Sequence, residues 1–289
     1  MDRSRSSRST SQVSYQDAAT RTVPVNGVDF VYRQLGSDGG VPLVFLNHLA
    51  GVLDNWDPRV VDGLAVHRRV ITFDNRGVGA SAGATPDTIE AMAGDAVAFI
   101  RALRLDHVDL LGMSMGGFVA QVIAQQEPPL IRRIILAGTG PAGGDGINRV
   151  TRLMLQDIAR GALTFQDPKQ YTFFTRTATG RLAGHDFLRR LKERRHDRDK
   201  AISPRAFRAH LTAVHRWGNQ EPADLSTIAH PVLVTNGDSD RIVPSKNTID
   251  LAERLPNSEL IPLYPDAGHG AIFQNHQQFV PKALAFLTP

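Results

Sequence analysis

Ser114 lies between two glycines in the segment 112–116, GMSMG, which follows an apolar run and precedes a helical stretch. The apolar run Val108 to Leu111 predicts a buried strand, and Phe118 to Ala124 predicts part of a helix. A side chain on so sharp a turn is held out above the edge of the sheet, and glycines beside it avoid collision with neighbouring backbone. The pattern predicts a serine that acts as a nucleophile.

A serine hydroxyl is a weak nucleophile at neutral pH, so this chemistry also requires a histidine base and a carboxylate that orients it. The chain has ten histidines, of which His269 is the best placed. It lies in a small-residue loop, 266–270, after an expected strand from Leu260 to Tyr264. Its place near the C-terminus also fits the chain order serine, acid, histidine. We therefore expect His269 to be the base.

The orienting acid is expected after another buried strand, Pro231 to Thr235. The polar loop that follows, residues 236–244, contains two carboxylates, Asp238 and Asp240. The strand and the loop do not by themselves choose between them. The carboxylate without a catalytic role is expected to cap the loop by accepting hydrogen bonds from nearby amides.

Backbone N–H groups must hold the negative charge that develops on the substrate oxygen. The N–H of Met115, directly after the serine, is one expected donor to this oxyanion hole. The second is expected from the loop Asn47 to Gly51, in which either Leu49 or Ala50 would donate. His48 is also a catalytic candidate in that loop, but a histidine there is expected to brace the loop by hydrogen bonding.

Together these residues resemble the α/β-hydrolase fold superfamily, in its branch of serine esterases, enol-lactonases and cofactor-free haloperoxidases or perhydrolases. The segment 74–81, DNRGVGAS, is similar to the D-x-R-G-x-G-x-S turn of that superfamily, and SMGG at 114–117 is similar to many of its serine turns. The resemblance runs from Thr22 to the C-terminus apart from one inserted region. It implies an α/β fold with a mostly parallel central sheet flanked by helices, and an inserted helical cap, or lid.

The resemblance also separates the two acid candidates. In the family the acid comes three residues after the glycine that ends the strand and four residues before a proline. Asp240 stands in that position between Gly237 and Pro244, so it is favoured over Asp238. One departure concerns Leu49, which stands where the family usually has a glycine after a histidine. That departure leaves the second oxyanion donor open.

The implied activity is hydrolysis of a carboxylic ester or lactone of a small molecule through an acyl-enzyme on Ser114. Asp240 and His269 would complete the triad, and the serine argues against the branches that use an aspartate nucleophile. No metal or organic cofactor is implied, since no cluster of His, Asp or Glu has the spacing of metal ligands. Perhydrolysis, hydrolysis of a carbon–carbon bond and a non-catalytic ligand receptor on the same fold stay open as alternatives.

The elements that must position these residues follow from the apolar patterns. Thr22 to Gln34 alternates apolar and polar residues around Asn26-Gly27, which predicts a hairpin that opens the sheet. Strands and helices then alternate as right-handed crossovers require, with the clearest helix at Thr88 to Leu103. Besides those already named, strands are expected at Val41 to Leu46, Val70 to Phe73 and Ile131 to Ala137.

The alternation stops between Gly138 and Pro222, where four helical segments follow one another near 148–160, 169–176, 185–195 and 204–217. An inserted cap explains this break, and such a cap lines the acyl pocket and excludes water. We expect a disordered tail at 1–20, the hydrolase core at 21–140 and 223–289, and the cap at 141–222, hinged at 140–146. The sequence does not predict whether the side chains of several candidate pocket residues point into the pocket: Met113, Phe165, Phe173, Phe174 and Trp217.

The cap is basic, since residues 146–222 carry 16 Lys and Arg against 7 Asp and Glu, while the rest of the chain has a net charge of −5. Acids and bases alternate in Arg189 to Lys200, which favours a solvated helical face over a nucleic-acid or membrane surface. A sharper hypothesis is that cap arginines steer anionic substrates toward the site.

Composition suits a single large core, with 289 residues of which 42% are hydrophobic. The longest apolar run, Val41 to Leu46, is far shorter than the roughly 20 residues that cross a bilayer, so no membrane span is expected. The Arg- and Ser-rich residues 1–12 do not resemble a secretory signal, and the absence of Cys fits a reducing compartment. We therefore expect a cytoplasmic protein with a small-molecule partner, and the oligomeric state stays open.

Overall fold

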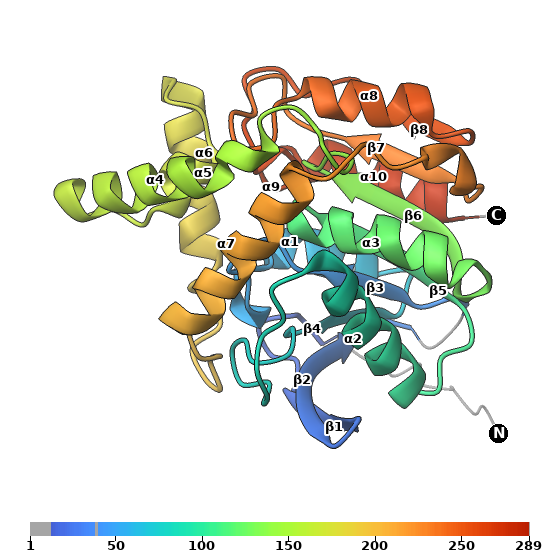
Figure 1. Ribbon diagram of the computed structural model, residues 1–289. Helices are drawn as coiled ribbons and strands as arrows, with labels where there is room; N and C mark the ends of the chain where they lie inside the picture. The colour runs from blue at the N-terminus through green and yellow to red at the C-terminus, as the bar shows by residue number, and fades with distance from the viewer. Residues whose placement is uncertain (1–12, 38–39, 289) are drawn as a thin grey trace, which may run out of the picture.

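The computed structural model describes residues 13–37 and 40–288, and their strands form one eight-stranded sheet (Figure 1). The strand order is β1-β2-β4-β3-β5-β6-β7-β8, with β2 antiparallel to β1 and β4 and the remaining neighbours parallel. This mostly parallel sheet flanked by helices confirms the expected fold class. The strands are β1 (Arg21–Val25), β2 (Val28–Leu35), β3 (Leu43–Leu46), β4 (Val70–Phe73), β5 (Val108–Met113), β6 (Ile131–Ala137), β7 (Val232–Thr235) and β8 (Ser258–Leu260).

Helices cover both faces of the sheet. In Figure 1, α2 and α3 lie in front of the sheet, and α1 and α10 lie behind it. Thr88 starts the first of these front helices, because its side chain accepts a hydrogen bond from the N–H of Ala91 at 3.2 Å. The helices of the core are α1 (Pro58–Ala65), α2 (Ile89–Ala102), α3 (Met115–Gln126), α8 (Lys246–Arg254), α9 (Ala271–Gln274) and α10 (His276–Leu287). Short 3₁₀ turns occupy Leu53–Asn55, Pro128–Leu130, Ile147–Arg149 and Leu225–Thr227.

The sequence located most strands well but misplaced the last one. The expected strand at Leu260 to Tyr264 begins earlier, at Ser258, and ends at Leu260. Pro262 has no N–H to give to the ladder, so the chain leaves β7 there and returns only for an isolated bridge between Gly237 and Tyr264. The hairpin is as expected, since Asn26 and Gly27 both have positive φ values, 49° and 77°.

Between β6 and β7 the described residues contain helices and no strand. We call residues 141–222 the helical insertion. Three of its helices differ from the expected ranges, because α4 runs on to Thr164, α5 already ends at Phe173 and α6 already begins at Ala178. Thr177 starts α6 by accepting a hydrogen bond from the N–H of Gly180 at 3.0 Å. The four helices are α4 (Val150–Thr164), α5 (Lys169–Phe173), α6 (Ala178–Arg190) and α7 (Pro204–Gly218), which lie together beside the sheet in Figure 1.

Part of the expected N-terminal tail is packed against the core. Tyr15 is buried and its hydroxyl donates to the carbonyl of Leu53 at 2.7 Å. Arg194 of the helical insertion donates to the carbonyls of Gln16 and Ala18 at 3.0 and 2.9 Å. These hydrogen bonds hold residues 15–18 in place, whereas the expectation for residues 1–12 lies outside the described part of the chain.

A buried ion pair fastens the helical insertion to the core. The guanidinium of Arg190 donates to both carboxylate oxygens of Asp57, at 3.0 and 2.6 Å, and to the carbonyl of Phe273 at 3.2 Å. The Asp57 side chain has no exposed surface and that of Arg190 is 11% exposed. The positive charge of Arg190 is therefore paired with a core carboxylate and attaches the insertion to the core.

A second attachment joins two carboxyl groups. The N–H of Leu53 donates to Asp74 Oδ1 at 2.9 Å and to Asp199 Oδ2 at 3.3 Å, so the buried Asp74 of the core meets Asp199 of the insertion. Burial raises the pKa of Asp74 well above its usual value, and the hydrogen bond with Asp199 and its negative charge raise that pKa further. The raised pKa favours the protonated form of Asp74, which can donate a hydrogen bond to Asp199.

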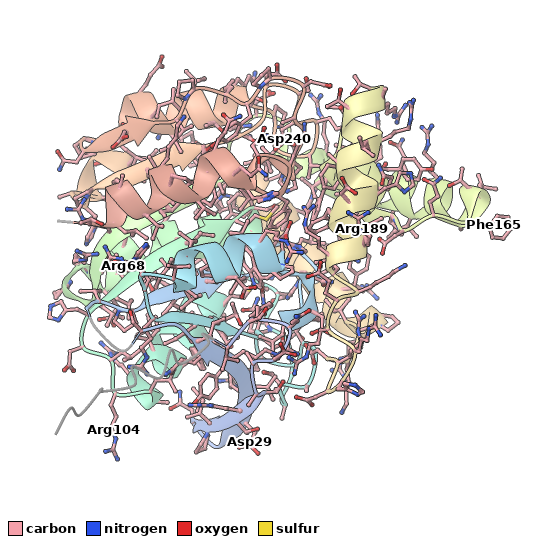
Figure 2. The ribbon with its side chains drawn as sticks, turned by 180° about the vertical axis from the view of Figure 1, so that it is seen from behind. Asp29, Arg68, Arg104, Phe165, Arg189 and Asp240 are labelled. Carbon is pink, nitrogen blue, oxygen red and sulfur yellow. The ribbon has the colours of Figure 1, made fainter. Side chains whose placement is uncertain are left out.

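Replacing Arg190 by alanine should destabilise the fold by about 3–5 kcal/mol, because it leaves the Asp57 carboxylate buried without a cation. The matched control is Arg189→Ala, since the Arg189 side chain, labelled in Figure 2, is 76% exposed and forms an exposed ion pair with the neighbouring Asp186. Urea unfolding measures both variants. Equal losses of stability in the two variants would contradict the account of this attachment.

Replacing Asp199 by asparagine should stabilise the protein at pH 8 and have little effect at pH 4. The pKa of Asp74 is higher in the folded protein than its unfolded value of about 3.9. The contact therefore stabilises the fold most below pH 3.9, and this contribution is lost as the pH rises through the folded-state pKa. An asparagine amide would donate to the Asp74 carboxylate at every pH. We expect a melting temperature higher by about 2 °C or more at pH 8. The exposed Asp106→Asn is the control, and a gain independent of pH would disprove the protonation of Asp74.

Candidate active site

Ser114 occupies a strained turn between β5 and α3. Its backbone has φ 54° and ψ −120°, a conformation that side-chain-bearing residues seldom adopt. A Cβ on Gly116 would lie 2.0 Å from the carbonyl oxygen of Leu46, and one on Gly112 would lie 2.5 Å from the carbonyl oxygen of Gly116. Both glycines are therefore required by close backbone packing, as the sequence pattern predicted.

His269 and Asp240 form a buried hydrogen-bonded pair. The distance between His269 Nδ1 and Asp240 Oδ2 is 2.7 Å, and both side chains are nearly inaccessible to solvent. The other carboxylate oxygen accepts from the N–H groups of Ile242 and Val243 at 2.8 and 3.1 Å. Because a carboxylate can only accept, Nδ1 of His269 carries a proton, and Nε2 of the neutral ring then has a free lone pair.

The two acid candidates differ in their surroundings. Asp238 is exposed and accepts a hydrogen bond from the hydroxyl of Ser239 at 2.7 Å. Asp240 lies at the junction of the core with the helical insertion, where it is labelled in Figure 2. Within the described residues, His269 contacts Asp240 by hydrogen bond and makes no such bond to Asp238.

Ser114 and His269 line one narrow pocket with a volume of about 20 Å³. That volume accommodates about one water-sized molecule. No hydrogen bond joins the two side chains among the described residues, and in unliganded sites such bonds are often long. The pocket is closed by apolar residues from both the core and the insertion: Leu49, Phe118, Val150, Met154, Phe173, Val214, Ile242 and Val243.

The backbone around Ser114 supplies N–H groups for an anion. Met115 is the first residue of α3, so its N–H has no partner within the helix. The N–H of Ala50 donates to Nδ1 of His210 at 3.2 Å. For the N–H groups of Leu49 and Met115, the described residues offer no hydrogen-bond partner. Of the two loop candidates, only Leu49 thus has its donor unengaged.

His48 braces the same loop, as its position suggested. Its Nδ1 donates to the carbonyl of Leu49 at 2.8 Å, and its ring meets the ring of Phe173 edge-on at 5.1 Å. Burial lowers the pKa of His48 to about 3, so the ring is neutral at physiological pH.

The sequence did not identify His210, which holds the Ala50 amide from the insertion. It is fully buried on α7, and burial lowers its pKa to about 4. A signal for it existed, because His210 falls on the apolar row of α7 that includes Ala206, Ala213 and Trp217. A histidine on the buried row of a helix in the insertion therefore marks a contact with another part of the chain, here the loop after β3.

A larger cavity of about 510 Å³ adjoins the narrow pocket and shares His48, Leu49, Met154, Thr172 and Phe173 with it. Its further walls come from the core loop after β3 and from the helical insertion. They include apolar side chains and five charged ones: Ala50, Val52, Ile158, Pro168, Ala201, Ile202, Pro204, Phe207, Asp54, Asp167, Lys169, Arg198 and Asp199. This cavity is large enough for a small organic substrate.

The candidate pocket residues from the sequence take different positions. Phe173 lines both cavities, whereas Trp217 stacks on Phe118 at 5.3 Å within the core. Phe165 is 97% exposed and points into solvent (Figure 2). Met113 and Phe174 are buried in the hydrophobic core.

The described residues contain no group of three or more His, Asp or Glu side chains that is arranged to hold a metal ion. None of their helices has the length and apolarity needed to cross a membrane.

Proteins similar to this chain include enzymes named for several reactions. A solved alpha/beta hydrolase fold protein from Chitinophaga pinensis is 39% identical, with a TM-score of 0.91 over 96% of this chain and 99% of that one. A protein from Agrobacterium fabrum, provisionally named the carbamate hydrolase RutD, is 27% identical over 88% of this chain and 95% of its own length. A non-heme chloroperoxidase from Streptomyces lividans is 26% identical over 91% and 97%.

The family model described as alpha/beta hydrolase fold matches residues 41–276, most of the chain. The matched range contains the serine turn, the acid loop and His269. The chain belongs to the alpha/beta hydrolase fold family.

Proposed function

We propose that the protein is a serine hydrolase that cleaves a small carboxylic ester or lactone through an acyl-enzyme on Ser114. One observation carries this proposal: His269, joined to the buried Asp240 at 2.7 Å, shares a pocket with a serine on a strained turn. A base that is hydrogen-bonded to an orienting acid, close to a serine hydroxyl, is what nucleophilic catalysis by serine requires.

In the acylation step, Nε2 of His269 takes the proton of Ser114 as Oγ attacks the carbonyl carbon. The charge that forms on the carbonyl oxygen is held by the N–H groups of Met115 and Leu49, aided by the positive N-terminus of α3. Asp240 stabilises the imidazolium, because its carboxylate accepts a hydrogen bond from the Nδ1–H of His269. The tetrahedral intermediate then expels the alcohol, which takes its proton from His269.

Deacylation repeats the same steps with water. His269 removes a proton from the water that attacks the ester on Ser114, and the serine leaves with the proton that the histidine returns. The narrow pocket beside these residues has room for one water molecule. The product acid then leaves through the larger cavity.

The helical insertion would act as the cap over this site. Met154 and Phe173 line both the narrow pocket and the larger cavity. These two side chains must therefore move aside when a substrate carbonyl passes from the cavity to Ser114. Closure behind the substrate excludes bulk water and strengthens the electrostatic interactions in the site.

Perhydrolysis is a second candidate, favoured by the similarity to a non-heme chloroperoxidase over 91% of this chain. The acyl-enzyme is the same, and hydrogen peroxide replaces water as the attacking molecule. A peracid rather than an acid is then released. Whether peroxide competes effectively with water for the acyl-enzyme separates the two functions.

Replacing Ser114 by alanine should lower kcat on p-nitrophenyl esters by a factor on the order of 10⁶, because the triad acts as a unit. The assay is run across acyl chain lengths, with the native chain under identical conditions as the reference. The preferred length reports the size of the cavity beneath the insertion. Turnover that survives in the alanine variant would disprove the acyl-enzyme on Ser114.

Replacing Asp240 by asparagine should lower kcat by about 10⁴, as expected when the orienting carboxylate of a triad is lost. The matched control is Asp238→Asn, two residues away in the same loop, which should stay within about twofold of the native rate because Asp238 is exposed. Stopped-flow or steady-state ester hydrolysis measures both. The reverse pattern would assign the acid to Asp238.

A further inference from the structure

The peptide group between Leu49 and Ala50 is held at both of its polar ends by buried histidines. The carbonyl of Leu49 accepts a hydrogen bond from Nδ1 of His48 at 2.8 Å, and the N–H of Ala50 donates to Nδ1 of His210 at 3.2 Å. His48 belongs to the loop after β3, whereas His210 lies on α7 of the helical insertion. The core and the insertion therefore fix the same peptide plane from two sides.

The backbone at Ala50 needs such support. Its φ is 62°, in the left-handed region that residues with a Cβ seldom adopt. A conformation of this kind persists only where the surrounding contacts hold it. One further hydrogen bond closes the turn, from the N–H of Gly51 to the carbonyl of His48 at 2.9 Å. Without the contact to His210, the N–H of Ala50 would lose its partner and Ala50 would be free to relax toward an ordinary conformation.

We propose that His210 is a positioning residue, which sets the direction in which the N–H of Leu49 points toward the substrate oxygen. This inference rests on the proposed reaction, in which that N–H holds the oxyanion. The N–H groups of Leu49 and Ala50 belong to adjacent planar peptide groups that pivot about one Cα, so the position of one plane limits the other. His210 lines neither the narrow pocket nor the larger cavity, and it therefore acts through the loop.

The two contacts require opposite tautomers of the two histidines. A carbonyl only accepts, so Nδ1 of His48 carries a proton. A backbone N–H only donates, so Nδ1 of His210 is unprotonated and the proton of the neutral ring is on Nε2. Burial lowers the pKa of His48 to about 3 and that of His210 to about 4, which keeps both rings neutral at physiological pH. The neutral rings are the forms that hold the peptide group.

The face of α7 that carries His210 also lines the path of the substrate. Phe207 borders the larger cavity, and Val214 borders the narrow pocket. His210 is three residues after the first and four before the second, a spacing that places all three on one side of the helix. Seating of α7 against the core would thus complete the oxyanion hole at the same time as it closes the pocket.

His210→Leu should lower kcat on p-nitrophenyl esters by about 10²-fold with little change in KM, because a misplaced N–H weakens binding of the transition state alone. His210→Asn should recover most of this loss. Asparagine has the same branched shape as leucine, and its side-chain oxygen can accept the N–H of Ala50 in place of Nδ1. A role in packing alone would make the two variants alike, so equal kcat values would overturn the proposal.

The matched control is Leu211→Ala, which shortens a partly buried side chain at the next position of α7 that lines neither cavity. This variant should lower the urea midpoint and leave kcat within about twofold of the native value. A loss of kcat as large as that in His210→Leu would show that any loosening of α7 has the same effect, which would contradict the role assigned to His210.

Amide hydrogen exchange, followed by NMR, tests the contact without any turnover. The N–H of Ala50 should exchange slowly in the native chain and in His210→Asn, and about tenfold faster in His210→Leu, which lacks the acceptor. A long-range ¹H–¹⁵N spectrum should show Nδ1 protonated in His48 and unprotonated in His210.

These spectra separate the two proposals. If the native chain hydrolysed no ester, the proposed reaction would fail, yet slow exchange at Ala50 that is lost in His210→Leu would still support the contact. Unchanged exchange in His210→Leu, or a proton on Nδ1 of His210, would refute the positioning role even in an active esterase.

Discussion

The strained backbone at Ser114 is the constraint on which the site depends. A left-handed residue at the end of β5 turns the chain directly into α3, and this turn is possible only because Gly112 and Gly116 leave room for backbone contact. The carbonyl of Leu46, at the end of β3, packs against Gly116. One contact therefore fixes the serine, the first turn of α3 and the start of the loop that follows β3.

The acid and the base depend on a similar close approach. A Cβ on Gly237 would lie 1.9 Å from the carbonyl oxygen of Ala267, so the loops that carry Asp240 and His269 touch backbone to backbone. The insertion joins this arrangement, because the N–H of Gly270 donates to the carbonyl of Phe173 at 2.7 Å. Movement of α5 would thus be transmitted to the loop that carries His269.

Much of the core was predictable because parallel strands in this sheet are buried on both faces and read as short apolar runs. The ranges of β4 and β6 agree with the expectation to the residue, and Thr88 marked the start of α2. The last strand was misplaced because apolar composition outweighed Pro262 in the sequence pattern. Helix starts in the insertion were missed where a single capping residue, Thr177, decides the boundary.

The site was partly predictable for the same reason. Glycines and a serine in a fixed pattern report backbone geometry, and the structure brings His269 to Asp240 as the sequence led us to expect. What the sequence lacked was information on contacts between distant segments. The apolar row of α7 marks His210 as buried but does not name the Ala50 amide as its partner, and the meeting of Asp74 with Asp199 leaves no local pattern. The same holds for the exposed leucines of α4, Leu155 and Leu163, since an apolar helical row looks alike whether it is buried or exposed.

The central claim is that Ser114 becomes covalently acylated. The most direct test is the intact mass of the protein after treatment with a fluorophosphonate, followed by peptide mapping of the adduct. The account predicts one adduct per chain, located on Ser114, with ester hydrolysis lost in proportion to labelling. An adduct on another residue, or full activity in a completely labelled protein, would contradict it.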